Sequence, residues 1–72
     1  MSFEEYIQIN QEVRFGKPTI IGTRISVSDV LNWLAAGQSF EEILLDFPEL
    51  NVNQLKACCA YAANKDENVR VA

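Results

Sequence analysis

The chain has 72 residues, of which 49% are hydrophobic, so it forms one small domain with more apolar material than so small a body readily buries. Its formal net charge of −4 argues against indiscriminate binding to nucleic acid. No apolar run is long enough to cross a membrane, and residues 1–5 are acidic rather than basic, unlike a signal peptide. We therefore expect a cytoplasmic protein that forms a homodimer and does not associate with a membrane.

Charge is distributed unevenly along the chain. Residues 28–51 contain five acids and no base, whereas residues 1–27 contain three acids and three bases. The segment expected to form the third helix contains no acid before Asp66. A surface that faces an anion must therefore lie on that helix or on the N-terminal part of the chain.

Residues 1–27 are predicted to form a β-arm ahead of the helices. Residues 6–9 are rich in β-forming side chains and end at a turn residue, asparagine. Residues 19–21 and 24–26 flank Gly22, and a glycine at the first central position favours a two-residue type II′ hairpin. Because an isolated hairpin is only marginally stable, we expect these strands to pair with the same segment of a second chain.

Three amphipathic segments follow and predict a mainly helical fold. The expected helices cover residues 27–36, 40–47 and 52–64, each with apolar side chains at helical spacing. Residues 28–64 then form a three-helix unit, and residues 65–72 a frayed tail. The whole chain of 72 residues is expected to be a single domain.

Capping residues mark the helix ends. Ser26 lies three residues before Asp29, and Ser39 lies three residues before Glu42, which is the spacing of a capping box. Gly37 is expected to end the first helix in a left-handed conformation, because glycine tolerates a positive φ.

The third helix is expected to begin after an N-cap at Asn51. Its inward face is predicted to consist of Val52, Leu55, Cys59 and Ala62, with Cys58 beside them. The side chains expected to lie mostly outside are Asn53, Gln54, Lys56, Ala57 and Tyr61.

Part of the sequence is recognisable. Residues 16–25 read Gly-Lys-Pro-Thr-Ile-Ile-Gly-Thr-Arg-Ile, and Val27 follows. Together with the runs Leu34-Ala35-Ala36-Gly37-Gln38-Ser39, Glu42-Ile43, Phe47-Pro48 and Ala60-Tyr61-Ala62, this stretch resembles the bacterial domain of unknown function numbered 433. The resemblance implies a homeodomain-like trihelical fold with a helix-turn-helix behind an N-terminal β-arm, and a role as a VapB-type antitoxin. Such antitoxins are usually encoded beside a PIN-like toxin nuclease, which they neutralise, and some repress the promoter that both genes share.

The last two helices are compatible with a DNA-binding helix-turn-helix. The side chains expected to contact base edges or phosphates are Asn53, Gln54, Lys56 and Arg24. Three features argue against this role: Leu44 occupies a position that such motifs usually keep small, the turn is one residue longer than usual, and so few lysines release few counterions. The alternative is a plain packed three-helix unit in which Arg24 pairs with an acid such as Asp29.

Other side chains are candidates for a protein interface. Aromatic and strand residues expected to contact a partner are Trp33, Tyr6, Ile7 and Ile9. The acidic residues Glu41, Glu42, Asp46 and Glu49 either dock a basic toxin or form a solvated helix face.

The sequence offers no catalytic constellation. Cys58 and Cys59 are adjacent rather than spaced as Cys-x-x-Cys, and the chain has no histidine, so one chain cannot assemble a tetrahedral zinc site. We expect both cysteines to be reduced core residues. We also expect no catalytic residue, no metal site, no cofactor and no enzymatic activity.

The family resemblance implies a small antitoxin-like regulatory protein that binds and inhibits a cognate PIN-like toxin nuclease, with promoter DNA as a further partner. The alternative is a dimeric protein-interaction module that has no DNA-binding role.

Overall fold

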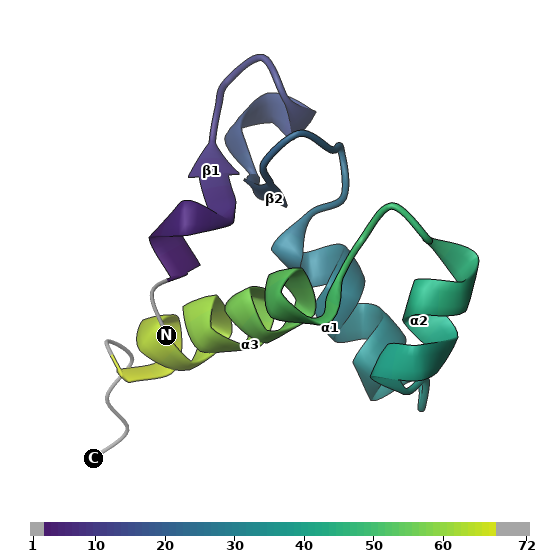
Figure 1. The fold of residues 1–72 in the computed structure, drawn as a ribbon. Coiled ribbons are helices and arrows are strands. Elements are labelled where there is room, and N and C mark those ends of the chain that lie inside the picture. Colours follow the sequence, from purple (N-terminus) through teal and green to yellow (C-terminus); the bar gives the residue numbers. More distant parts are fainter. Residues whose placement is uncertain (1–2, 68–72) are drawn as a thin grey trace.

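The computed structural model describes residues 3–67, with side chains described through residue 64. Its fold is mainly α-helical, with a short two-stranded antiparallel sheet near the N-terminus (Figure 1). The elements are the 3-10 helices η1 (Phe3–Glu5) and η2 (Arg14–Gly16), the strands β1 (Ile7–Ile9) and β2 (Pro18–Ile20), and the helices α1 (Val27–Ala35), α2 (Phe40–Asp46) and α3 (Val52–Glu67). We call residues 3–26 the arm.

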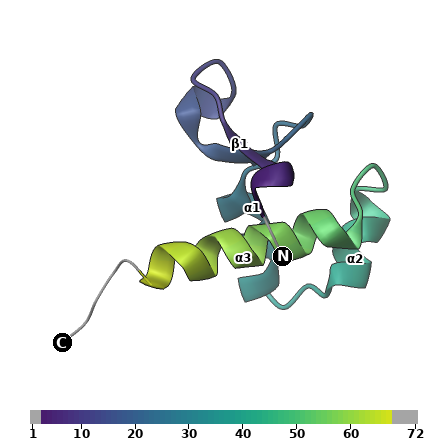
Figure 2. The ribbon, with the colours of Figure 1, turned by 60° about the vertical axis from the view of Figure 1, so that its left-hand side comes forward.

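The arm and α2 occupy different parts of the molecule. Figures 1 and 2 both show the arm projecting from α1 and α3, whereas α2 lies at the N-terminal end of α3. Within the described residues, no helix combines the length and the apolar character needed to span a lipid bilayer.

The two strands of the arm pair with each other. β1 and β2 are antiparallel, with Ile7 opposite Ile20 and Gln8 opposite Thr19. Strands were predicted close to both positions, at residues 6–9 and 19–21, but their pairing with each other was not. We expected these strands to pair with a second chain, and instead they pair within one chain. The sequence separation between them is bridged by η2, which no local sequence signal indicated.

The turn around Gly22 differs from the predicted two-residue hairpin. The carbonyl oxygen of Ile20 accepts a hydrogen bond from the amide of Thr23 at 3.0 Å, so the turn begins at Ile20 and Gly22 is its third residue. Gly22 has φ +84°, which suits glycine at this position of a type II turn. The Thr23 hydroxyl closes the turn by donating to the Ile20 carbonyl at 2.8 Å and accepting from the Ile25 amide at 3.0 Å. The Ile20 amide also donates to the carbonyl of Ile25 at 2.9 Å, and Thr19 forms an isolated antiparallel bridge with Ser26. The predicted pairing of residues 24–26 with residues 19–21 is therefore present in part, although the chain enters the N-cap of α1 at Ser26 before a full strand forms.

Both predicted capping boxes are present. The Ser26 hydroxyl accepts from the Asp29 amide, and the Asp29 carboxylate accepts from the Ser26 amide, both at 3.0 Å. Ser39 and Glu42 make the same pair of bonds at the start of α2, at 3.1 and 2.8 Å. Each box satisfies backbone donors that the first helical turn leaves without partners. The helices therefore begin where these serines stand.

The predicted stop of α1 is also confirmed. Gly37 has φ +100°, and its amide donates to the carbonyl of Leu34 at 3.0 Å. The Gln38 amide donates to the carbonyl of Trp33 at 3.1 Å, which completes a Schellman motif. The second helix ends one residue earlier than expected, at Asp46, with Phe47 as its C-cap.

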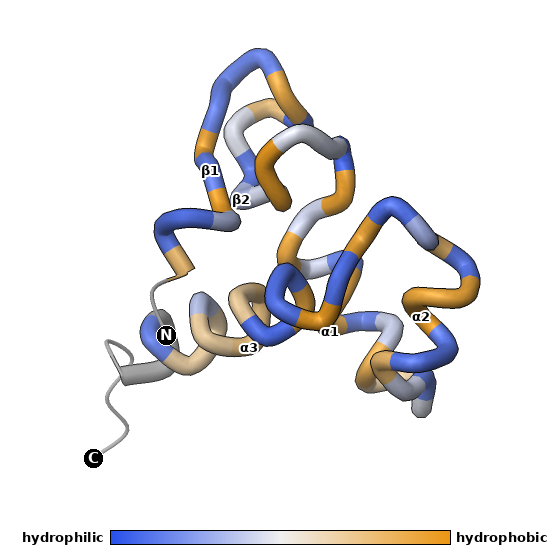
Figure 3. The backbone as a smooth tube through the Cα atoms, in the orientation of Figure 1, coloured by the Kyte–Doolittle hydropathy of each residue, from blue (hydrophilic) through white to orange (hydrophobic). Residues whose placement is uncertain are grey.

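The core draws on the arm as well as on all three helices. Its buried apolar side chains are Ile7, Ile20, Val27, Val30, Ile43, Leu50, Leu55, Ala57 and Cys58. Hydrophobic and hydrophilic residues alternate along α1 and α2 in Figure 3, as expected for helices with one buried face. The arm is therefore part of the folded body and not an appendage.

The inward face of α3 was predicted correctly only in part, since Leu55 and Cys58 are buried as expected. Ala57 is fully buried although we placed it outside, and Val52 is 40% exposed although we placed it inside. Tyr61, also placed outside, packs edge-on against Phe3 with ring centroids 5.2 Å apart. The reason is that α3 packs against α1 and α2 and also against η1 and β1, so it buries two sides.

The C-terminal end of α3 also differs from the prediction. The helix continues to Glu67 rather than stopping near Asn64, so part of the expected frayed tail is helical. The rest of that tail, residues 68–72, lies outside the described residues.

Candidate interaction surfaces

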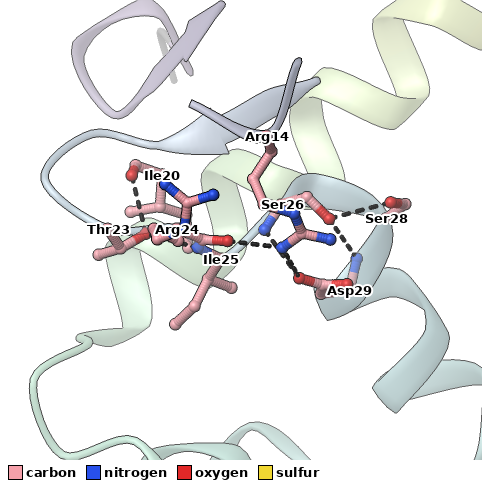
Figure 4. Close-up of polar contacts among 8 residues, drawn as sticks. All are labelled: Arg14, Ile20, Thr23, Arg24, Ile25, Ser26, Ser28 and Asp29. Carbon is pink, nitrogen blue, oxygen red and sulfur yellow. Dashed lines mark hydrogen bonds and ion pairs between the residues drawn. The ribbon is translucent and has the colours of Figure 1, made fainter. Parts of the chain in front are cut away.

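Arg14 joins the arm to the start of α1. Its Nη1 donates to the carbonyl oxygen of Arg24 at 2.7 Å and to Oδ2 of Asp29 at 3.0 Å (Figure 4). The side chains of Arg14 and Asp29 are each about one third exposed. Sequence reasoning offered Arg24 as the partner of Asp29, and this was wrong: Arg24 contributes only its backbone carbonyl, and its side chain is exposed. We call the three-residue contact of Arg14, Arg24 and Asp29 the arm clamp.

Asp29 is held in its charged form. Partial burial acts to raise the pKa of Asp29, but the backbone amide of Ser26 and the hydrogen bond and charge of Arg14 act in the opposite direction and lower it. The net effect is a pKa below the ordinary value of 3.8. The capping box and the clamp therefore both depend on this one ionised carboxylate.

The turn that carries Arg14 has an unusual backbone. Arg14, Phe15 and Gly16 have φ values of +53°, +59° and +83°, so three consecutive residues are left-handed. For the two that are not glycine this conformation costs on the order of 1–3 kcal/mol each. The arm clamp and the backbone hydrogen bond from Lys17 to Arg14, at 3.2 Å, hold the turn in place.

Phe15 points away from the protein from this turn. It is 95% exposed, which is unusual for a phenylalanine in so small a fold. We did not predict a role for Phe15 from the sequence, because no short motif indicates its left-handed backbone.

The predicted DNA-contacting residues come from two parts of the chain. Asn53 and Lys56 are exposed on α3, whereas Arg24 lies on the arm. Gln54 forms hydrogen bonds with Asn51. The side-chain Oε1 of Gln54 accepts from the backbone amide of Asn51 at 2.8 Å, and the backbone amide of Gln54 donates to the side-chain Oδ1 of Asn51 at 3.0 Å. A third capping box thus uses the oxygen that Gln54 would need to read an adenine with two bonds.

The predicted partner-contacting residues lie mostly against the protein's own core. Ile7 is 8% exposed and belongs to that core, and Tyr6 packs against it. Trp33 stacks on Phe47, with ring centroids 4.7 Å apart and planes at 15°. Ile9, in contrast, is 62% exposed. Their part in binding another protein stays a prediction.

The outer side of α2 combines acidic and apolar groups. Leu45 is 81% exposed, and an open hollow of about 580 Å³ is lined by Ser39, Glu41, Glu42, Leu44 and Leu45. Asp46 and Glu49 are also exposed nearby in the sequence. We call Glu41, Glu42, Leu45, Asp46 and Glu49 the acidic surface. Among described residues 28–51 no base is present to neutralise it.

A second hollow lies beside the arm and is almost entirely apolar. Its volume is about 310 Å³, and its lining residues are Lys17, Pro18, Val27, Ser28, Leu31, Tyr61 and Ala62. The arm, the first turns of α1 and the later part of α3 meet there. We call it the apolar groove.

Cys58 has the character of a core residue, whereas Cys59, which we expected in the core, is only partly buried. Cys58 is buried, and burial, followed by the neighbouring Cys59, raises the pKa of its thiol to about 12. A thiol with so high a pKa stays protonated and is a poor nucleophile or metal ligand. In the described part of the chain, no group of three histidine, cysteine or acidic side chains is arranged to hold a metal ion.

Comparison with known proteins gives a family match. The family described as "Protein of unknown function (DUF433)" matches residues 7–62. Uncharacterized protein y4eO of Sinorhizobium fredii is 33% identical over 58 residues, which is 81% of this chain and 26% of that protein. The chain therefore spans about a quarter of the length of this curated relative. No solved structure matches the chain.

Proposed function

This chain belongs to the DUF433 family of proteins of unknown function, and from that premise we propose that it is an antitoxin-like protein that binds and inhibits a PIN-like toxin nuclease. The proposal includes a cytoplasmic location, where an RNA-cleaving toxin acts, and self-association of the chain. The observation that carries it is the acidic surface around the exposed Leu45.

The electrostatic argument is direct. A nuclease must attract a polyanion, so its substrate-binding region presents positive potential. An inhibitor that offers several carboxylates is attracted to the same region and competes with the nucleic acid. Glu41, Asp46 and Glu49 are exposed, and within residues 28–51 no base offsets them. Leu45 adds an apolar group at the centre, the arrangement typical of a protein interface with a polar rim.

The test is inhibition of the nuclease encoded beside this chain. Co-purification of the two proteins and loss of RNA cleavage are expected for the wild type. Glu41→Lys combined with Asp46→Lys should weaken binding by at least about tenfold, with a larger loss at low salt. Glu42 is left intact because it caps α2.

A matched control separates the surface from total charge. Glu5→Lys changes an exposed acid on η1, away from α2, and alters the net charge by the same amount as Glu41→Lys alone, with which it is compared. It should leave inhibition nearly unchanged. Equal losses from the control and from the α2 variant, or no binding by the wild type, would contradict the proposal. Binding to a protein that is not a nuclease would favour the alternative, a dimeric interaction module.

Promoter binding is the second candidate, with α2 and α3 as a homeodomain-like helix-turn-helix. It is favoured by Asn53 and Lys56, which are exposed near the start of α3. Five residues, 47–51, separate the two helices, more than the three or four of the common motif. Band shifts on the DNA upstream of the gene should weaken with added salt and with Lys56→Glu. A shift that ignores both changes would remove DNA from the proposal.

A further inference from the structure

We propose that two copies of this chain pair through their arms, with Phe15 of each copy seated in the apolar groove of the other. The pairing rests on the self-association included in the proposed function and does not require the nuclease. It also differs from the strand pairing expected from the sequence, since β1 and β2 already pair within one chain.

Phe15 is exposed on a turn whose backbone is held in place. It is 95% exposed, yet its turn is held by the arm clamp through two bonds from Arg14, at 2.7 and 3.0 Å. Backbone strain at a non-glycine residue persists only where the surroundings enforce it. A turn whose backbone is already held in place loses little backbone freedom on binding, and this favours its aromatic side chain as an interface anchor.

The same chain also carries a receptor for that side chain. The apolar groove has a volume of about 310 Å³, and Pro18, Val27 and Leu31 supply much of its wall. Burying a phenylalanine side chain there would remove apolar surface from water and so stabilise the pair. One small chain thus carries both an exposed aromatic side chain and an apolar groove that can receive it.

Phe15 is also close in the sequence to a residue that lines the apolar groove. Phe15 is three residues from Pro18, which lines the groove, so anchor and receptor belong to the same part of the arm. When both lie on one face, two copies related by a two-fold axis make each contact twice. Such a closed pair is the commonest form of soluble oligomer.

Charge supports a second copy as the occupant. Glu12 is exposed on the turn that carries Phe15, and Lys17 is exposed at the groove. Insertion of Phe15 would bring Glu12 of one copy towards Lys17 of the other, twice in a two-fold pair. The acidic surface lies on α2, away from the arm in both Figure 1 and Figure 2, so two chains of net charge −4 can meet without bringing it together.

The experiment measures self-association of the isolated chain. Sedimentation equilibrium or light scattering over a micromolar concentration series should show a monomer–dimer equilibrium for the wild type. Phe15→Asn removes the anchor but suits the left-handed backbone, so the fold should persist. It is expected to weaken dimerisation by at least about tenfold. Val52→Ala is the control, since it trims another exposed apolar residue, at the start of α3, and should leave dimerisation unchanged.

A charge exchange tests the pairing geometry. Glu12→Lys and Lys17→Glu should each weaken the dimer, and the double variant should recover most of the loss, since both cross-copy pairs are restored with reversed sign. Circular dichroism of each variant confirms folding. A wild-type chain that stays monomeric, or a dimer unaffected by Phe15→Asn, overturns the inference. Because no nuclease is present, that failure would leave the inhibition test intact.

Discussion

The arm and the three-helix unit are stabilised in different ways. α1 and α2 begin at capping boxes that span three residues, so their position is encoded locally. The arm is fixed by contacts between distant parts of the chain: β1 pairs with β2, and Arg14 reaches Asp29 across 15 residues. The starts of these two helices are therefore set by neighbouring residues, whereas the structure of the arm depends on contacts between distant parts of the chain.

The largest expected effect is a loss of stability that tests whether the arm folds independently of the helices. Ile20 lies on β2 and is fully buried in the shared core, as is Leu55 on α3. Ile20→Ala and Leu55→Ala should each lower the free energy of unfolding by about 2–5 kcal/mol, because each leaves a cavity. Urea denaturation followed by far-ultraviolet circular dichroism measures both. A loss confined to Leu55→Ala would show that the arm is an independent attachment.

A smaller effect isolates the arm clamp. Arg14→Met keeps the aliphatic stem but removes both hydrogen bonds made by Nη1, and we expect a loss of about 1 kcal/mol. The value is modest because the pair is about one third exposed and is screened by solvent. Arg24→Met is the matched control: its carbonyl remains, so its effect should stay within about 0.5 kcal/mol. Equal effects of the two changes would argue against the clamp.

The pH dependence of stability tests the contact between Arg14 and Asp29. The pKa of Asp29 is lowered in the folded chain, so its stabilising contribution is complete above the unfolded value, about 3.9, and is lost as the pH falls through the lower folded value. Asp29→Asn should therefore reduce the loss of stability on acidification below about pH 4. Thermal unfolding at a series of pH values compares the variant with the wild type. If the variant and the wild type lose the same stability on acidification, Asp29 does not contribute to the pH dependence of stability.

The smallest effect concerns a buried hydroxyl in the arm. Thr19 is fully buried, and its Oγ1 has no hydrogen-bond partner among the described residues. Thr19→Val keeps the shape and removes the polar atom, so it should be neutral or stabilising by up to about 1 kcal/mol. Thr23→Val provides the contrast, since that hydroxyl makes two hydrogen bonds and its loss should be destabilising. Differential scanning calorimetry distinguishes the two signs.

The sequence predicted those features whose causes lie within a few residues. Ser26, Ser39 and Gly37 set the bounds of α1 and the start of α2 because capping is local. The buried face of α3 could not be predicted in the same way. Alanine and cysteine give it little contrast in hydropathy, visible as the pale colours of α3 in Figure 3, and it packs on two sides.

The candidate surfaces also differ in how local their causes are in the sequence. The acidic surface was visible in the sequence because charges exposed on one helix face follow helical spacing. Arg14 and Phe15 were not visible, because the clamp needs the arm folded back on α1 and a left-handed backbone leaves no pattern in these residue types. The Gly-Lys-Pro run did identify the family, and residues 7–62 carry that match.

The stacked pair of Trp33 and Phe47 has a practical consequence. Trp33 is the single tryptophan of the chain, and it sits where α1 meets the end of α2. Its emission is therefore an intrinsic optical probe of the docking between these two helices. Comparing that signal with a dye placed on the arm would tell whether both parts of the molecule melt together or in sequence.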